Sequence, residues 1–248
     1  MLGFARVSCF AVSWFIVFIS NAAAAENLGS GLAINGGATA VSDYRFRGIS
    51  QTNKRIAIQG TLTLSHSSGV YASVWGSSID DYAAAGGDAE LDLILGFRKV
   101  VGSTTLDGGL LYYYYPGSNG ANTDFAEPYL KVSQAIGRAT FTGTIAYAPK
   151  QDALTVGNGK EDNLYLAGDL NYAIPKTTIG LTAHLGRSFG PSYLTIGDDY
   201  TDWSLGATVT HKNLSAGLSY VDTNKSLFAP SGRNISNAGV VASFGVAF

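Results

Sequence analysis

Charged residues recur at every second position in several short stretches of this sequence. Asp43, Arg45 and Arg47 follow this spacing, and so do Glu90 and Asp92. Successive side chains of an extended strand point to opposite faces, so residues two positions apart share a face. Carboxylates and guanidinium groups on one face can pair with each other or can form a charged lining that selects ions. The spacing therefore predicts non-covalent recognition of ions or polar solutes.

The histidines are the remaining candidates for catalysis or metal binding. His66, His184 and His211 lie in separate stretches of the chain, without the close spacing of zinc-ligand motifs. No serine is predicted to lie in the strand-to-helix elbow that presents the nucleophile of many hydrolases. We therefore expect no metal site, no cofactor and no catalytic centre.

The elements that position the charged residues are predicted to be half-apolar β-strands. In one stretch, Leu91, Leu93 and Leu95 lie on one face, and Glu90, Asp92, Ile94 and Gly96 lie on the other. The same period of two recurs in three later stretches, 163–172, 178–186 and 202–210. Each has the length of a tilted strand that crosses a bilayer, about 9–11 residues. No apolar repeat with the helical period of 3.6 residues is sustained beyond the first 32 residues.

The sequence contains about twelve such strands. An even number is typical of bacterial outer-membrane barrels and brings both ends of the barrel to the periplasmic side. We therefore predict an all-β fold, an antiparallel up-and-down transmembrane β-barrel. The expected strands are 37–49, 55–66, 70–79, 89–99, 105–115, 125–136, 139–148, 163–173, 178–187, 201–211, 214–223 and 238–248.

The lengths of the connections support this orientation. Periplasmic turns are short in such barrels, and external loops are longer. The even-numbered connections are short, at 67–69, 100–104, 137–138, 174–177 and 212–213. The odd-numbered ones are longer, at 78–88, 116–124, 149–162, 188–200 and 224–237. The first connection, Ser50 to Lys54, is the exception because it is predicted to be external but short.

Residues 1–25 are predicted to form a cleaved signal peptide, followed by the barrel domain over 26–248. Arg6 supplies a positive charge, residues 7–19 are mostly apolar, and small residues precede Glu26. This order is typical of secretory signals, and the apolar run is shorter than the ~20 residues that a membrane-spanning helix needs. Cleavage is predicted after Ala25, with Ala23 as the other small residue of the A-x-A pattern.

The cysteine content and the net charge argue against two classes of protein, disulfide-stabilised scaffolds and nucleic-acid-binding proteins. Cys9 is the sole cysteine, so the mature chain lacks the thiols of a disulfide scaffold. Loss of Arg6 leaves 15 basic residues (16 − 1) against 18 acidic ones, a net charge of −3. A nucleic-acid partner is not expected, because binding it would require a basic stripe.

The last strand carries an assembly signal in this interpretation. Phe244, Val246 and Phe248 share one face, and Phe248 stands at the end of the strand. A terminal strand that ends in an aromatic residue resembles the signal recognised by the barrel-assembly machinery, which is therefore an expected partner.

Aromatic residues are predicted to form belts at the two lipid–water interfaces. Within the run Tyr112–Tyr115, Tyr112 and Tyr114 share one face and Tyr113 and Tyr115 the other, so two of the four tyrosines are expected to point into the lumen. The residues expected near the outer ends of strands are Tyr44, Phe46, Trp75, Tyr82, Phe125, Tyr129, Tyr147, Tyr165, Tyr200 and Trp203. Those expected near the inner ends are Phe97, Phe141 and Tyr172.

Residues 42–52, with the sequence SDYRFRGISQT, resemble the opening motif of the TorF-type porin family. Shorter matches follow in order through the first half of the chain, at 59–60, 65–66, 69–72, 75, 90–92, 96, 115–117 and 127–130. The resemblance implies an exported β-barrel of the Gram-negative outer membrane. It implies little about transport, because the family is defined by barrel shape rather than by known solutes.

The polar face of the strands is expected to line the lumen. Two hypotheses follow, a narrow channel for passive diffusion of ions or small polar solutes, and a barrel filled by an internal network of ion pairs. Both need the same candidates, Asp43, Arg45, Arg47, Glu90, Asp92, Arg98, Glu127, Lys131, Asp169, His184 and Asp202.

Two further hypotheses place the function outside the lumen. One is a structural barrel whose external loops bind a partner. The other is a lipid hydrolase, which would need a histidine facing outward near the outer leaflet. His66 and His211 fall at predicted periplasmic ends, and His184 is predicted to point inward in mid-strand. The channel in the outer membrane, surrounded by lipid, is therefore the preferred hypothesis.

Overall fold

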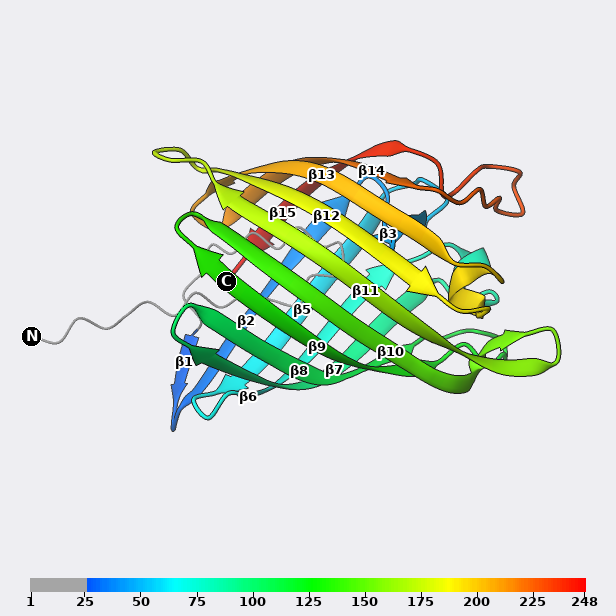
Figure 1. Cartoon of the computed structure of the whole chain (residues 1–248), viewed down its shortest axis with the longest axis horizontal. Coiled ribbons are helices and arrows are strands. Elements are labelled where there is room, and N and C mark those ends of the chain that lie inside the picture. The colour runs from blue at the N-terminus through cyan, green and yellow to red at the C-terminus, as the bar shows by residue number, and fades with distance from the viewer. Residues whose placement is uncertain (1–25) are drawn as a thin grey trace, which may run out of the picture.

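The alternating stretches of the sequence form the strands of a closed antiparallel barrel in the computed structural model, which describes residues 26–248 (Figure 1). Among the described residues, twelve strands form the ring and follow each other in chain order. They are β2 (Leu32–Val41), β5 (Ala57–His66), β6 (Val70–Ser78), β7 (Ala89–Val101), β8 (Thr104–Tyr114), β9 (Phe125–Ile136), β10 (Ala139–Val156), β11 (Gly159–Ala173), β12 (Ile179–Phe189), β13 (Tyr200–His211), β14 (Leu214–Thr223) and β15 (Gly239–Ala247). The predicted fold class is confirmed.

The ring closes where β2 pairs with both β5 and β15. Val41 lies opposite Ala57 of β5 on one side and opposite Ser243 of β15 on the other. Beyond the end of β15, the short strand β1 (Glu26–Gly29) continues the pairing along β2. Phe248 completes the join, since its backbone N–H and C=O both bond to Gly36, at 2.9 and 3.0 Å. Closure removes the unpaired strand edges that lipid could not satisfy.

The two faces of each strand differ in polarity. Leu93 and Leu95 of β7 are 50% and 63% exposed on the outside, whereas their neighbours Glu90 and Asp92 are buried inside. This apolar outer surface suits the hydrocarbon of a bilayer, where backbone groups must be paired within the protein. No helix among the described residues is long and apolar enough to cross a membrane.

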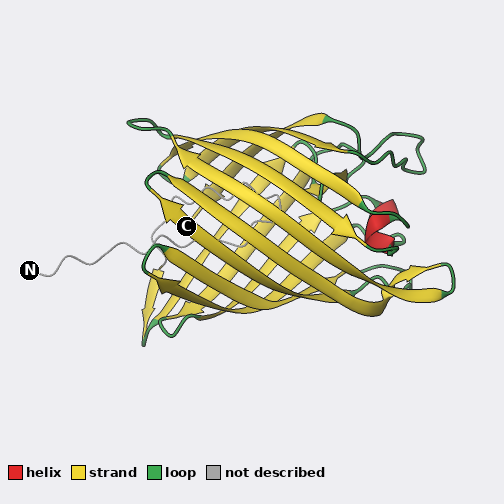
Figure 2. Ribbon diagram, viewed as in Figure 1, coloured by secondary structure: helices red, strands yellow, loops and turns green. Residues whose placement is uncertain are grey.

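Short turns and long connections lie at opposite ends of the barrel (Figure 2). The end that carries β1 and the C-terminus has the predicted short turns. The other end has the longer connections, including the 3₁₀ turns η1 (Asp81–Ala84) and η2 (Tyr193–Thr195). The predicted first strand over 37–49 is wrong, because β2 ends at Val41. The first connection is therefore residues 42–56 and is long, as the orientation requires.

A second correction concerns residues 149–162, which were predicted to be a loop. They continue β10 and β11 beyond the rim as a hairpin (Figure 1). Val156 and Gly159 pair around the turn, in which Gly157 has a φ of 63°. Pro149 interrupts the ladder without ending the strand, because register shifts there accommodate its missing N–H.

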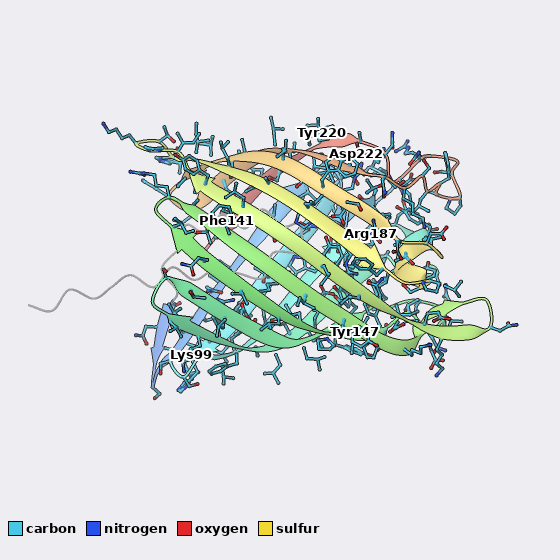
Figure 3. All side chains as sticks on the ribbon, viewed as in Figure 1. Lys99, Phe141, Tyr147, Arg187, Tyr220 and Asp222 are labelled. Carbon is cyan, nitrogen blue, oxygen red and sulfur yellow. The ribbon has the colours of Figure 1, made fainter. Side chains whose placement is uncertain are left out.

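The aromatic belts are composed differently from the prediction. Tyr44, Trp75, Phe125, Tyr129, Tyr165 and Tyr200 are all buried inside the barrel. The outward-facing aromatic residues of the strands include Tyr112, Tyr114, Tyr147 and Tyr220 towards the external end and Phe97, Phe141, Tyr172 and Phe244 towards the other. Three of them, Phe141, Tyr147 and Tyr220, are labelled on the outside of the barrel in Figure 3. A position near the end of a strand does not by itself show whether an aromatic side chain faces lipid or the lumen. The alternation along the strand decides which face it lies on. The predicted signal peptide, including Ala23 and Ala25, lies outside the described residues.

Candidate functional site

The first external connection folds into the barrel instead of extending outward. Its residues 42–56, here called the inward segment, contain a short hairpin of β3 (Arg45–Phe46) and β4 (Ile49–Ser50). Arg47 and Gly48 form the two-residue turn with φ angles of 46° and 79°. Positive φ at both positions matches the right-handed twist of a tight hairpin. Such a conformation is unfavourable for arginine, so the contacts of Arg47 must hold it there.

Asp43 holds the inward segment together. One carboxylate oxygen accepts a hydrogen bond from Arg45 Nε at 2.6 Å. The other accepts hydrogen bonds from the hydroxyls of Ser50 and Thr52 at 2.5 and 3.3 Å. The Asp43 and Arg45 side chains are only 7% and 3% exposed. Buried charges are costly unless they are paired and hydrogen-bonded, so this cluster stabilises one conformation of the segment.

Arg45 connects the inward segment to the last external connection. Its guanidinium donates to the carbonyls of Ile235 and Asn237 at 3.3 and 3.2 Å. The backbone N–H of Ser50 also donates to Ile235, at 2.8 Å. Ile49 packs there with Tyr200, Ala229 and Ile235 in a buried apolar cluster. The segment is thus fixed to a second loop at the external mouth.

The connection around η1 supports the segment from another side. Tyr82 donates a hydrogen bond to the Ser50 carbonyl, and burial raises the pKa of its hydroxyl. Arg55, at the end of the segment, pairs with Asp80. Burial acts to raise the pKa of the Asp80 carboxyl, but hydrogen bonds from the Arg55 and Asp81 side chains lower it overall. Three external connections therefore meet over the lumen.

Arg47 at the hairpin tip reaches the wall formed by β9 and β11. Its guanidinium pairs with Glu127 at 2.6 Å and donates to the Asn163 side chain at 2.6 Å. The guanidinium carbon lies 4.1 Å from the centre of the Tyr165 ring. The Arg47 and Glu127 side chains are each 1% exposed. An ion pair with so little access to solvent indicates that the tip is packed tightly against this wall.

Phe46 extends the same contact with an aromatic cluster. Its ring lies edge-on to Tyr113 at 5.8 Å, and Tyr113 stacks on Phe125 at 4.2 Å. Tyr113 also donates to Glu127 at 3.2 Å. Alternate tyrosines of this run face opposite sides, as predicted, and the structure places Tyr112 and Tyr114 outside and Tyr113 inside.

A pair of acidic residues lies beneath the start of the segment. Tyr44 donates to Glu90 at 3.2 Å, and its ring lies 5.4 Å from Trp75, edge-on. Asp92 follows on the same face of β7 and lies opposite Trp75 in register. The two arginines of the inward segment have different acidic partners, since Arg45 pairs with Asp43 and Arg47 pairs with Glu127.

Deeper in the barrel, charged residues of adjacent strands lie in one row. Arg98 pairs with Asp107 at 2.7 Å, and Lys131 is the neighbour of Asp107 in register on β9. The Tyr71 hydroxyl donates to Asp107 at 2.7 Å. Asp107 was missed by the sequence reasoning. It lies six residues before Tyr113 on the same strand and therefore on the same face, which was the signal available to find it.

His184 lies in a second polar group between β11, β12 and β13. Its Nδ1 is 2.7 Å from Asp169, and its Nε2 is 3.1 Å from Asp202 and 3.0 Å from the Tyr165 hydroxyl. Both ring nitrogens are thus occupied by oxygen partners. In residues 26–248 no group of three or more histidine, cysteine or acidic side chains is arranged to hold a metal ion.

One serine has a spacing that the sequence reasoning overlooked. Gly186, Ser188 and Gly190 form the pattern G-x-S-x-G. Ser188 lies within β12 rather than in a strand-to-helix elbow, and it is fully buried between Tyr165 and Tyr200. The pattern therefore does not present a nucleophile here.

The predicted lumen residues face the interior of the barrel, as their burial and strand register indicate. Most are almost fully buried, and three are partly exposed to the lumen, namely Arg98, Asp169 and His184. The almost fully buried ones are Asp43, Arg45, Arg47, Glu90, Asp92, Glu127, Lys131 and Asp202. The first three belong to the inward segment instead of the strand that was predicted to carry them.

A cavity lies beside the inward segment. On one side it is lined by Asp43, Tyr44 and Arg45 of the segment. On the other it is lined by residues of β2, β5, β14 and β15, among them Thr39, Gln59, Ser219 and Ser243. The segment therefore narrows the lumen without filling it.

The sequence of this barrel matches the profile of a known protein family. The profile of a family described as "Bacterial protein of unknown function (Gcw_chp)" matches residues 24–246. The chain belongs to this family. No curated protein sequence matches it significantly.

Solved structures show how the Gcw_chp barrel compares with other barrels. The NanC porin, in a rhombohedral crystal form, aligns with a TM-score of 0.59 and 14% identity, over 87% of this chain and 99% of the porin. The COG4313 outer membrane channel from Pseudomonas putida F1 aligns with a TM-score of 0.50 and 13% identity, over 91% and 98%. At such low identity these similarities show that the fold of this Gcw_chp protein is that of outer-membrane porins and channels.

Proposed function

We propose that this Gcw_chp protein is a narrow channel of the outer membrane for passive diffusion of ions or small polar solutes. The observation that carries the proposal is the cavity beside the inward segment, which is lined by residues of the segment and by both polar and apolar residues of β2, β5, β14 and β15. An eight-stranded barrel is filled by its side chains, and a sixteen-stranded one leaves an open pore. Twelve strands with one inward connection fit a constricted passage between these cases.

The outer surface and the chain ends support the membrane location. The exposed faces of the strands are apolar, and the barrel closes without a free strand edge. Residues 1–25 would direct export and be removed after Ala25. The strand that ends near Phe248, with Phe244 and Val246 on the same outward face, would be recognised by the barrel-assembly machinery. The resemblance of residues 42–52 to the opening motif of TorF-type porins agrees with this proposal.

The alternatives explain less of the structure. A filled barrel accounts for the buried ion pairs of Asp43 and Arg47, but it leaves the cavity without a role. A hydrolase would require His184 to activate a serine, whereas both of its ring nitrogens contact other partners and it faces the lumen. These contacts of His184 favour a channel over an enzyme.

Conductance of the purified protein in a planar lipid bilayer tests the proposal. Insertion should produce discrete single-channel steps in potassium chloride. The same protein, heat-denatured before addition, should produce none. A bilayer that remains silent after verified insertion of folded barrels would contradict the channel and favour the filled barrel.

A further inference from the structure

The lumen has two unlike walls. Strands β7, β8, β9 and β11 carry large inward side chains, among them Leu111, Tyr113, Tyr129 and Tyr165, and most of the charged residues. Strands β14, β15, β2 and β5 carry mostly smaller ones at the inward positions, although Gln59, Val41, Val221 and Val241 also line the cavity there. Here the second surface is called the hydroxyl wall, defined by Thr39, Thr61, Thr63, Ser215, Gly217, Ser219, Ser243 and Gly245.

The inward segment leans toward the bulky wall. Phe46 and Arg47 contact Tyr113, Glu127 and Tyr165, all of which are nearly inaccessible to solvent. Water and solutes are therefore excluded from that side of the segment. The cavity lies on the opposite side, between the segment and the hydroxyl wall.

The cavity is nearly neutral. Of the residues that line it, the charged ones are Asp43 and Arg45, and they pair with each other at 2.6 Å. Hydroxyls of Thr39, Ser219 and Ser243 offer both hydrogen-bond donors and acceptors. Rings of unpaired charge would make a channel strongly ion-selective, but paired charges cancel most of their field.

We propose that solutes cross the barrel along the hydroxyl wall, past the Asp43–Arg45 pair, and that this passage favours small uncharged polar solutes. The inference rests on the proposed channel function and specifies its route and solute class. Glu90, Asp92 and Glu127 do not line the route, because they belong to the bulky wall and are buried there.

Cysteine substitution tests the route, because the sequence contains Cys9 alone. Ser243→Cys places a thiol on the hydroxyl wall. Attachment of a cationic or an anionic methanethiosulfonate reagent should reduce single-channel conductance at least twofold. The two reagents should shift ion selectivity in opposite directions, towards anions for the cationic reagent and towards cations for the anionic one.

Three controls accompany this variant. Ala242→Cys changes the adjacent residue on the outer face of β15, and Ala146→Cys changes a fully buried inward residue of β10. Treated wild-type protein, which loses Cys9 with the proposed signal peptide, reports any effect of the reagents that does not need an introduced thiol. None of the three should lose conductance. A conducting channel that the reagents do not alter at Ser243→Cys, or alter equally at Ala146→Cys, would overturn the route.

Swelling of protein-containing liposomes tests the solute class. A neutral pentose should enter several times faster than organic anions or cations of similar size. A channel that conducts ions but excludes the neutral pentose would overturn the solute class while leaving the proposed channel intact. Failure of both conductance and swelling in the wild type would instead reject the channel function and, with it, this inference.

Discussion

At the scale of single residues, the buried charges of the inward segment are the most informative feature. Asp43 and Arg45 form one ion pair, and Arg47 forms another with Glu127 of β9. Removing one partner of a buried pair leaves the other charge without compensation, which costs about 3–5 kcal/mol. Exposed pairs contribute only about 0–1 kcal/mol. Because buried and exposed ion pairs differ so much in energy, a substitution in an exposed pair serves as the control for the same substitution in a buried pair.

Asp43→Asn should destabilise the barrel. The amide can still accept hydrogen bonds from Ser50 and Thr52, but it leaves the buried Arg45 guanidinium without a counter-charge. We expect a loss of about 3 kcal/mol in the free energy of unfolding, measured by urea titration of vesicle-inserted protein. Asp199→Asn, which breaks an exposed pair with Arg187, should change it by less than about 1 kcal/mol. Equal effects of the two variants would show that the Asp43 cluster does not hold the segment.

At the scale of elements, the inward segment depends on the turn at its tip. Gly48 has a φ of 79°, and a Cβ atom there would lie 2.3 Å from the Thr223 side chain. Glycine is therefore required for two reasons, the backbone conformation and the close approach of β14. Sequence alone indicated neither, since Gly48 stood inside a predicted strand.

Gly48→Ala should loosen the hairpin and make the channel current noisier, with a wider spread of conductance levels. Gly232→Ala is the control, since its φ is 80° but no atom would lie within 4 Å of the added Cβ. Both variants carry the conformational penalty of positive φ, whereas the close contacts of the added Cβ, with Thr223 and Asp202, arise at Gly48 and not at Gly232. Similar single-channel records for the two variants would contradict the steric argument.

The join between β2 and β15 is a second element with a testable role. Deletion of Phe248 removes both backbone hydrogen bonds to Gly36 at the closing seam. We expect less folded barrel in the outer membrane, measured as the heat-modifiable band in membrane fractions. Phe141→Ala removes an outward-facing aromatic ring away from the seam and should reduce this band less. The reverse order would mean that interface aromatics matter more than seam closure.

The sequence predicted the strands better than it predicted the connections. Alternation places Leu95 outside and Asp92 inside with no knowledge of neighbours, because the pleat alone decides the face. The inward segment also alternates, through Asp43, Arg45 and Arg47, and thus imitates a strand. Its true path depends on partners such as Glu127, distant in the sequence, that no local pattern reveals.

The same limit applies to the candidate site. The lumen-facing charges could be identified from alternation, but their partners could not, since pairing depends on strand register and side-chain length. Asp107 was overlooked because small residues flank it on its own face, although its register with Arg98 makes the pair. The cavity beside the segment could not be predicted either, because it depends on which wall the hairpin contacts.

At the scale of the whole molecule, the bilayer is the solvent that the outer surface must match. A charge on the lipid face costs about 2–4 kcal/mol near the midplane and about 0–1 kcal/mol near the interface. Leu95 lies in the middle of β7 and is 63% exposed, whereas Leu28 lies in β1 at the end of the barrel and is 53% exposed. The two leucines are similarly exposed, so they differ mainly in depth, with Leu95 near the middle of the membrane and Leu28 near its surface.

Leu95→Arg should therefore lower the free energy of unfolding in lipid vesicles by about 2–4 kcal/mol, and Leu28→Arg by less than about 1 kcal/mol. In detergent micelles, which adapt to a local charge, the difference between the variants should shrink. If the two substitutions cost the same in vesicles, the outer face of β7 would not lie within hydrocarbon. The orientation of the barrel in the membrane would then be wrong, even though its internal geometry would stand.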